Sequence, residues 1–235
     1  MKFLKKFLKW LFITIFVLLV LIIAAPFIFK GKLIELAKDE INKNVNAKVE
    51  FGEFDLTVFS SFPDLTFEIN DVKVIGIEDF EKDTLLNLKK LETDIGLLSV
   101  LGSNIKVKSI IIDKADIKAK VLRNGTANWD IAQESETDTV ETESTEEEES
   151  TNYKLDLKEF RIINANIIYD DKDMDVYSNI KNLNFDLSGN LGLDQTVLET
   201  KTKIDELTVE YEGVKYFNKT AFELITDLDA DLVNF

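Results

Sequence analysis

The sequence of 235 residues contains no cysteine and no histidine. Without these side chains there is no thiol nucleophile, no disulfide framework, no imidazole general base and no zinc site built on Cys and His. The chain also lacks the GxGxxG, P-loop and GxSxG patterns that mark nucleotide-binding and hydrolase folds. We therefore expect a protein that is not an enzyme and that holds no cofactor and no metal.

Basic residues are scarce relative to acidic ones, with 28 Lys and Arg against 44 Asp and Glu, and the net charge is −16. Nucleic-acid binding depends on clustered Lys and Arg, so this balance argues against a nucleic-acid partner. The charge is unevenly distributed: residues 1–9 carry four lysines and no acid, whereas residues 133–151 carry nine acids and no base. Hydrophobic residues form 45% of the chain, which excludes disorder throughout.

The segment 10–29 is a run of twenty residues without a charge. As a helix rising about 1.5 Å per residue it would reach roughly 30 Å, the thickness of the hydrocarbon core of a bilayer. The lysines before it predict that residues 1–9 form a basic cytoplasmic tail and that the rest of the chain lies across the membrane. The alternative is a cleaved signal peptide. Pro26 directly follows Ala24-Ala25, which disfavours cleavage there, so we expect a retained signal anchor.

Residues 30–132 are expected to form a β domain with a leading amphipathic helix at 31–44. From Val45 onward apolar and polar residues alternate, for example over 65–70 and 115–121, which is typical of antiparallel strands with one apolar face. Asn124-Gly125 and Asp113-Lys114 stand where turns are needed. Residues 133–151 contain one hydrophobic residue, Val140, and are predicted to be a disordered acidic loop; binding of cations or of a basic partner is the alternative.

Residues 152–235 resume the alternation and repeat the first block at an offset of fifty residues. Corresponding pairs are Lys108 and Lys158, Ile110 and Phe160, Ile112 and Ile162, Ala115 and Ala165, Asp116 and Asn166, and Ile117 and Ile167. The repeat predicts one strand-turn-strand unit that is reused along a lengthening sheet. Further strands are predicted at 175–188, 197–211, 214–217 and 221–233. Because the last alternates up to Phe235, we expect this block to be a truncated part of a longer protein.

The order of these features resembles the N-terminal region of the AsmA family of bacterial envelope proteins. The resemblance covers residues 1–131 and, more loosely, 152–235. It is carried by Phe62-Pro63, Asp71-Val72, Leu97-Leu98, Ile105, Ile110–Ile112, Ala115, Ile117, Arg123-Asn124-Gly125 and Asn128-Trp129-Asp130. The chain departs from the family in length, since such proteins usually run to several hundred residues.

The resemblance implies a mainly β fold with an N-terminal transmembrane helix, an elongated, curved antiparallel sheet forming an open groove, and one or two short helices. It implies a single-pass protein of the bacterial inner membrane with its C-terminal part in the periplasm. AsmA-like proteins are similar to bridge-like lipid transfer proteins, so the implied function is part of a conduit for phospholipid supporting the outer membrane. The expected partners are the inner membrane, phospholipid acyl chains and outer-membrane components. The alternative is an assembly factor for outer-membrane proteins that acts through its sheet edge, without lipid transport.

Alternation alone does not separate an open groove from a closed core. If the groove is open, the central apolar residues of the strands are candidates for its wall. These candidates are Leu65, Phe67, Ile69, Ile117 and Ile167.

Overall fold

The computed structural model describes residues 6, 7, 9–14, 17, 31, 35, 45–57, 61–96, 99, 104–131, 152–191 and 195–231. The chain divides into two units, residues 1–40 and 41–235. In the first unit every described residue is helical. Within the described residues no helix is both long enough and apolar enough to cross a membrane. Much of the predicted span 10–29, most of the predicted helix 31–44 and all of the predicted acidic loop 133–151 lie outside the described residues.

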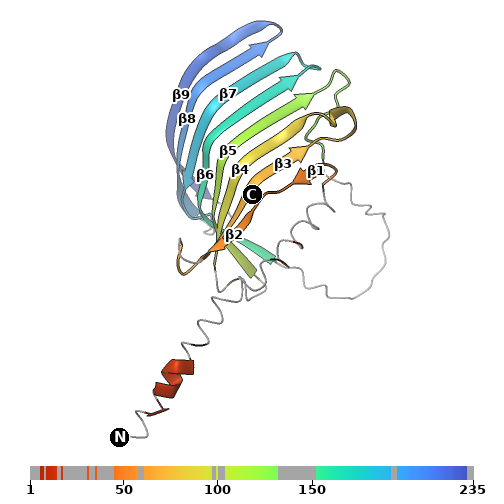
Figure 1. Ribbon diagram of the computed structural model, residues 1–235. Coiled ribbons are helices and arrows are strands. Elements are labelled where there is room, and N and C mark those ends of the chain that lie inside the picture. The colour runs from red at the N-terminus through yellow and green to blue at the C-terminus, as the bar shows by residue number, and fades with distance from the viewer. Residues whose placement is uncertain are drawn as a thin grey trace, which may run out of the picture. The chain divides into compact units, whose positions relative to one another are not determined.

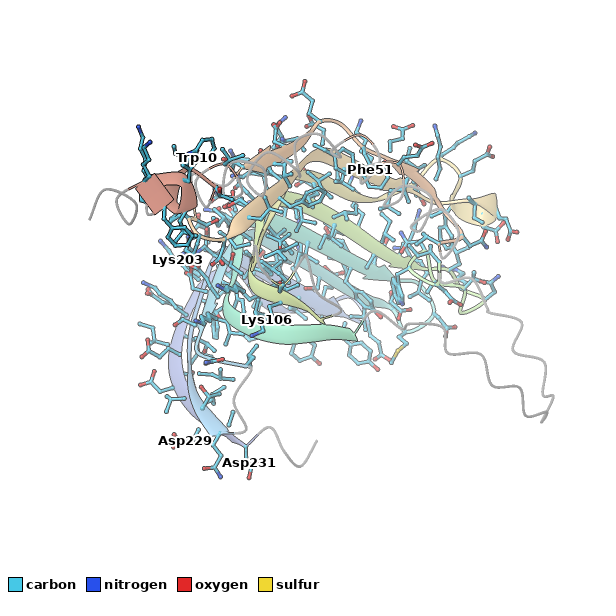
Figure 2. The ribbon with its side chains drawn as sticks, turned by 90° about the horizontal axis from the view of Figure 1, so that it is seen from below. Trp10, Phe51, Lys106, Lys203, Asp229 and Asp231 are labelled. Carbon is cyan, nitrogen blue, oxygen red and sulfur yellow. The ribbon has the colours of Figure 1, made fainter. Side chains whose placement is uncertain are left out.

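The second unit is one curved, open sheet of nine strands in the described residues, ordered β1-β3-β4-β5-β6-β7-β8-β9, with β2 beside β3 (Figure 1). The strands are β1 (Lys48–Glu50), β2 (Phe54–Thr57), β3 (Leu65–Ile75), β4 (Thr84–Ile95), β5 (Asn104–Val121), β6 (Asn152–Asp171), β7 (Val176–Ser188), β8 (Gln195–Tyr211) and β9 (Val214–Asp231). A short 3-10 helix, Glu78–Phe80, precedes β4. Figure 2 looks along the sheet and shows it curving from Phe51 at one side to Asp229 and Asp231 at the other. The predicted curved, mainly β architecture is confirmed.

One pair of strands differs from the predicted antiparallel arrangement. β5 and β6 are parallel, whereas all other neighbours are antiparallel. The parallel register matches Ile110 with Phe160 and Ile117 with Ile167, which is the fifty-residue offset of the sequence repeat. The two copies of the repeat therefore lie side by side, each contributing the same apolar positions to the same face. Alternation reports the faces of a strand and not its direction, which is why the sequence did not reveal the parallel pair.

A row of residues with left-handed backbone crosses the sheet about midway along its strands. The row comprises Asp71 on β3, Lys114 on β5, Asn164 on β6, Asn182 on β7 and Lys219 on β9, with φ between 52° and 54°. The register places Asp71 and Lys114 on either side of Lys89, and Lys114 beside Asn164. We call this row the crease. Figure 1 shows the strands bending about midway along their length.

The crease keeps the apolar side chains on one face while the strands bend. A left-handed residue shifts the alternation, so apolar residues on either side of it are spaced by three, as in Ile69 and Val72. Ala115 and Ala165 directly follow left-handed residues and are each only 1% exposed, whereas Lys114 and Asn164 are exposed. The small buried side chains indicate that the apolar face is on the inside of the bend.

Side-chain oxygens replace ladder partners that the backbone loses at the crease. The hydrogen bonds run from the N–H of Asn164 to Asn184 Oδ1 (3.1 Å), from the N–H of Asn182 to Asn166 Oδ1 (3.1 Å), and from the N–H of Lys219 to Thr208 Oγ1 (3.2 Å). An unpaired backbone N–H is costly, so these short polar side chains stabilise the bend.

Two predictions, a turn in β5 and a strand boundary in β9, are wrong because of the crease. Asp113-Lys114 is not a turn but lies inside β5, because one left-handed residue bends a strand without ending it. The predicted strands 214–217 and 221–233 are one strand, β9, which is bent at Lys219.

Replacing Lys114 by Gly should stabilise the protein. A left-handed conformation strains any residue that has a Cβ, and glycine adopts it freely, so we expect the free energy of unfolding to rise by about 0.5–1 kcal/mol. Lys114→Val should lower it by about 1–2 kcal/mol, because β-branched residues tolerate this conformation poorly. Urea unfolding measures the free energy of unfolding of both variants. The control is Lys118→Gly on the same strand, where the backbone is not left-handed and glycine should destabilise the protein. An unchanged midpoint for Lys114→Gly would contradict the strained conformation.

Candidate functional site

The two faces of the sheet differ in chemistry from β3 to β9. Residues that pair across strands share a face, so the register sorts the side chains. One face, here called the charged face, contains the row Glu68, Glu92, Ile111, Arg161, Asp186, Lys201 and Ile225. The other, the apolar face, contains the row Ile69, Leu91, Ile112, Ile162, Phe185, Thr202 and Leu224.

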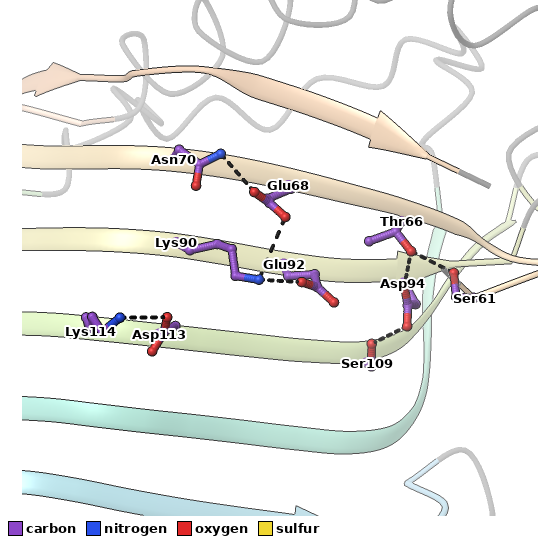
Figure 3. A network of polar contacts seen from close by, with 10 residues as sticks. All are labelled: Ser61, Thr66, Glu68, Asn70, Lys90, Glu92, Asp94, Ser109, Asp113 and Lys114. Carbon is purple, nitrogen blue, oxygen red and sulfur yellow. Dashed lines mark hydrogen bonds and ion pairs between the residues drawn. The ribbon is translucent and has the colours of Figure 1, made fainter. Parts of the chain in front are cut away.

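The carboxylates of the charged face over β3 to β5 find partners within the sheet (Figure 3). Lys90 Nζ lies 2.9 Å from Glu92 Oε2 and 3.8 Å from Glu68 Oε2. The hydrogen bond to Glu92 raises the pKa of Lys90 and keeps it protonated. Asp94 accepts hydrogen bonds from the hydroxyls of Thr66 (2.6 Å) and Ser109 (2.9 Å). These pairs satisfy the charges within the sheet, so this part of the face is a stable outer surface rather than a reactive one.

A hollow of about 460 Å³ lies on the charged face beside the crease. Its lining includes Lys73, Asn87, Asp116, Lys118 and Asn166. All five occupy exposed positions, and Asn166 Nδ2 donates to Asp116 Oδ1 at 2.8 Å. Thr84, Ile117 and Ile168 complete the lining, so polar and apolar side chains are mixed around this hollow.

The apolar face is covered at one side of the sheet and accessible at the other. On β3, Leu65 is 4% exposed and Ile69 is 8% exposed. On β9, Leu224 is 49% exposed, and Phe222 and Leu228 are exposed to a similar degree. Contiguous apolar surface of this kind is uncommon on soluble proteins unless something binds it.

The structure puts all five predicted wall residues on the apolar face. Leu65, Phe67 and Ile69 lie on β3 before the crease, while Ile117 and Ile167 pair with each other beyond it. The two groups therefore belong to two walls that meet at the crease. Since Leu65 and Ile69 are buried, they offer little surface to a ligand. Prediction from sequence missed the accessible residues of β8 and β9, although the alternation of Phe222, Leu224 and Leu228 with Glu223 and Asp227 was the signal that marks them.

A corner at 124–130 closes the edge of β5 where β4 has ended. The last β4 partner on that side is Leu86, opposite Ile117. Beyond it, Asn128 takes the place of a strand: its Oδ1 accepts the Lys120 N–H (2.8 Å), its Nδ2 donates to the Lys118 carbonyl (2.7 Å), and its own N–H donates to the Lys120 carbonyl (3.0 Å). Trp129 packs on Tyr169 with ring centroids 5.8 Å apart. The corner fixes the rim of the sheet at this end.

The turn between β6 and β7 is held by Asp171, which is buried. Its carboxylate accepts the backbone N–H of Met174 (2.8 Å) and of Asp173 (2.9 Å) and the hydroxyl of Tyr169 (2.8 Å). The hydrogen bond from Met174, followed by those from Tyr169 and Asp173, lowers the pKa of Asp171 and keeps it ionised. The residue has a structural role, since its oxygens are occupied by the turn.

The geometry thus consists of two apolar walls joined at a bend, with an ion-paired surface outside. Such a trough can shelter hydrocarbon from water while leaving one side open.

Comparison with curated proteins and with solved structures gives no match. The model of the AsmA family matches residues 1–226, which is almost the whole chain. The chain belongs to the AsmA family.

Proposed function

We propose that this protein is anchored in the bacterial inner membrane and holds phospholipid acyl chains in its apolar trough, as part of a conduit that supports the outer membrane. The observation that carries the proposal is the continuous apolar face, which runs from Ile69 on β3 to Leu224 on β9 and is exposed at β9. Burying hydrocarbon on this surface gains roughly 25 cal/mol for each Å² removed from water.

The anchoring part of the proposal rests on the N-terminal sequence. Four lysines precede an uncharged run of twenty residues, which favours insertion with the N-terminus in the cytoplasm and the sheet in the periplasm. A protein held at the membrane has direct access to the phospholipids that the trough would receive.

The test uses two adjacent residues of β9 that point to opposite faces. Leu224 lies on the apolar face and pairs with Thr202, whereas Ile225 lies on the charged face and pairs with Lys201. Both are exposed, at 49% and 67%. A photoreactive amino acid at position 224 of the full-length protein in cells should cross-link to phospholipid, detected by mass spectrometry of the adduct. At position 225 the same residue should give at least about tenfold less lipid adduct. Equal labelling at the two positions, or none at 224, would contradict lipid binding in the trough.

One observation favours the alternative, an assembly factor for outer-membrane proteins. Within the described residues β9 pairs only with β8, and nearly all of its residues are exposed, so its other edge presents backbone donors and acceptors. An extended segment of another protein can add to such an edge. Under this alternative the photoreactive residues on β9 would capture outer-membrane proteins at both positions, with no lipid adduct.

A further inference from the structure

The two walls of the trough differ in polarity, and the difference runs in one direction. The crease divides each strand into two halves. The upper wall is the half that leads to the turns at 172–175 and 212–213, and it is uppermost in Figure 1. The lower wall is the other half. On the upper wall, the second row from the crease is apolar from β3 to β8. It consists of Val74, Leu86, Ile117, Ile167, Ile180 and Leu207.

The next two rows of the upper wall introduce polar groups at increasing distance from the crease. The first is Ala119, Tyr169, Ser178, Val209 and Phe217, and the second is Val121, Asp171, Val176, Tyr211 and Val214. The rim therefore carries phenol, hydroxyl and carboxylate groups, together with Trp129 against Tyr169. Tyrosine and tryptophan favour boundaries between hydrocarbon and water, because one part of the side chain is apolar and another forms hydrogen bonds.

The lower wall gains threonine hydroxyls away from the crease, but these positions contain no phenol and no carboxylate. Its second row from the crease is Phe67, Thr93, Ile110, Phe160, Leu187, Thr200 and Thr226. Beyond it on β8 and β9 lies the pair Leu198 and Leu228. These positions carry no charge, and two of the three threonine hydroxyls are directed to backbone carbonyls: that of Thr93 to Ser109 (2.8 Å) and that of Thr200 to Thr226 (3.3 Å). Apolar surface thus continues outward along this wall.

We propose that the occupant of the trough is an amphiphile with one polar head and acyl tails, held in a fixed orientation across the strands. The head lies along the rim of the upper wall, at Tyr169, Ser178 and Tyr211, and the tails lie over the crease and the lower wall. This inference rests on the proposed function and deepens it, because it states which wall receives which part of the lipid. A tail placed on the upper rim would cover the hydroxyl groups of Ser178 and Tyr211, whereas a head placed on the lower wall would lose its water without gaining partners.

The test uses the full-length protein in phospholipid vesicles that contain one of two photoactivatable phospholipids. One probe carries its diazirine in the middle of an acyl chain, and the other carries it on the head. After irradiation, labelled peptides are identified by mass spectrometry. The tail probe should label Phe222, Leu224 and Leu228 of the lower wall, and the head probe should label Tyr211, Val214 and Trp129, with at least about a fivefold preference in each case.

The outcomes separate this inference from the proposed function. If both probes label the trough without preference, or with the walls reversed, the orientation is wrong while lipid binding stands. If neither probe labels the trough, lipid binding itself is wrong, and the orientation with it. A variant pair adds a second measurement. Tyr211→Leu removes a rim hydroxyl and should lower head labelling at the rim at least about threefold, whereas Tyr177→Leu, on the charged face opposite Glu210, should not change it.

Discussion

Replacing Asn128 by Ala should lower the free energy of unfolding by about 2–4 kcal/mol, a large part of the stability of an ordinary domain. The side chain makes two hydrogen bonds to the backbone of β5, and the residue is buried. Without it the Lys120 N–H and the Lys118 carbonyl lose their partners at an edge that β4 no longer covers. Each unsatisfied buried group costs about 1–3 kcal/mol. Urea unfolding followed by circular dichroism measures the change.

A matched control for this prediction lies in the same loop. Asn124 accepts one hydrogen bond from the Thr126 N–H (3.1 Å) and is exposed, so Asn124→Ala should cost no more than about 1 kcal/mol. The role given to Asn128 fails if the two variants lose similar stability. It also fails if Asn128→Asp, which keeps an acceptor for Lys120 and loses the donor to Lys118, is as stable as the parent.

Replacing Ile117 by Asp should remove most of the bound lipid while leaving the sheet folded. Ile117 is half-buried in the second row from the crease, between Leu86 and Ile167. An acyl chain covering this position would have to bury an unpaired carboxylate. That costs more than 1.4 kcal/mol, so lipid content should fall at least about tenfold. Because the trough is open, the carboxylate keeps water in the lipid-free protein, and the melting temperature should fall by only a few degrees.

The neighbouring residue supplies the control for Ile117→Asp. Lys118 lies on the charged face, opposite Ile168, so Lys118→Asp makes the larger change of charge without touching the trough. It should leave lipid content unchanged. Both quantities are measured on the same preparations, by mass spectrometry of extracted lipid and by thermal unfolding. If Ile117→Asp unfolds the protein and the parent carries no lipid, the apolar face is a closed core and the trough is wrong.

Alternation predicted most of the strands because their apolar face is a continuous surface. The predicted strands 175–188 and 197–211 agree with β7 and β8 to within two residues. The fifty-residue repeat was visible because two parallel strands side by side need the same apolar positions, as at Ile112 and Ile162. Its meaning was not visible, since the direction of a strand depends on where the chain returns and not on which residues alternate.

The crease was not predicted, although it leaves a trace in the sequence. An apolar spacing of three inside an alternating strand, as between Ile112 and Ala115 or Ile162 and Ala165, looks like the end of one strand and the start of another. Only the paired strands show that the interruptions of β3, β5, β6 and β7 fall at about the same level, with that of β9 displaced toward the turn at 212–213. The accessible wall on β8 and β9 was missed for a related reason, because exposure depends on what covers a face and not on the residues that form it.

The crease lets the trough grow in length without changing its cross-section. Five of the seven strands from β3 to β9 contain a left-handed residue, with β4 and β8 lying between them, so further strands of these types extend the trough by the spacing between strands, about 4.8 Å each. The seven strands from β3 to β9 span roughly 29 Å on this basis, close to the hydrocarbon thickness of a single bilayer. The length of the trough is therefore proportional to the number of strands. A sheet of this design that joined two membranes would need several times as many strands.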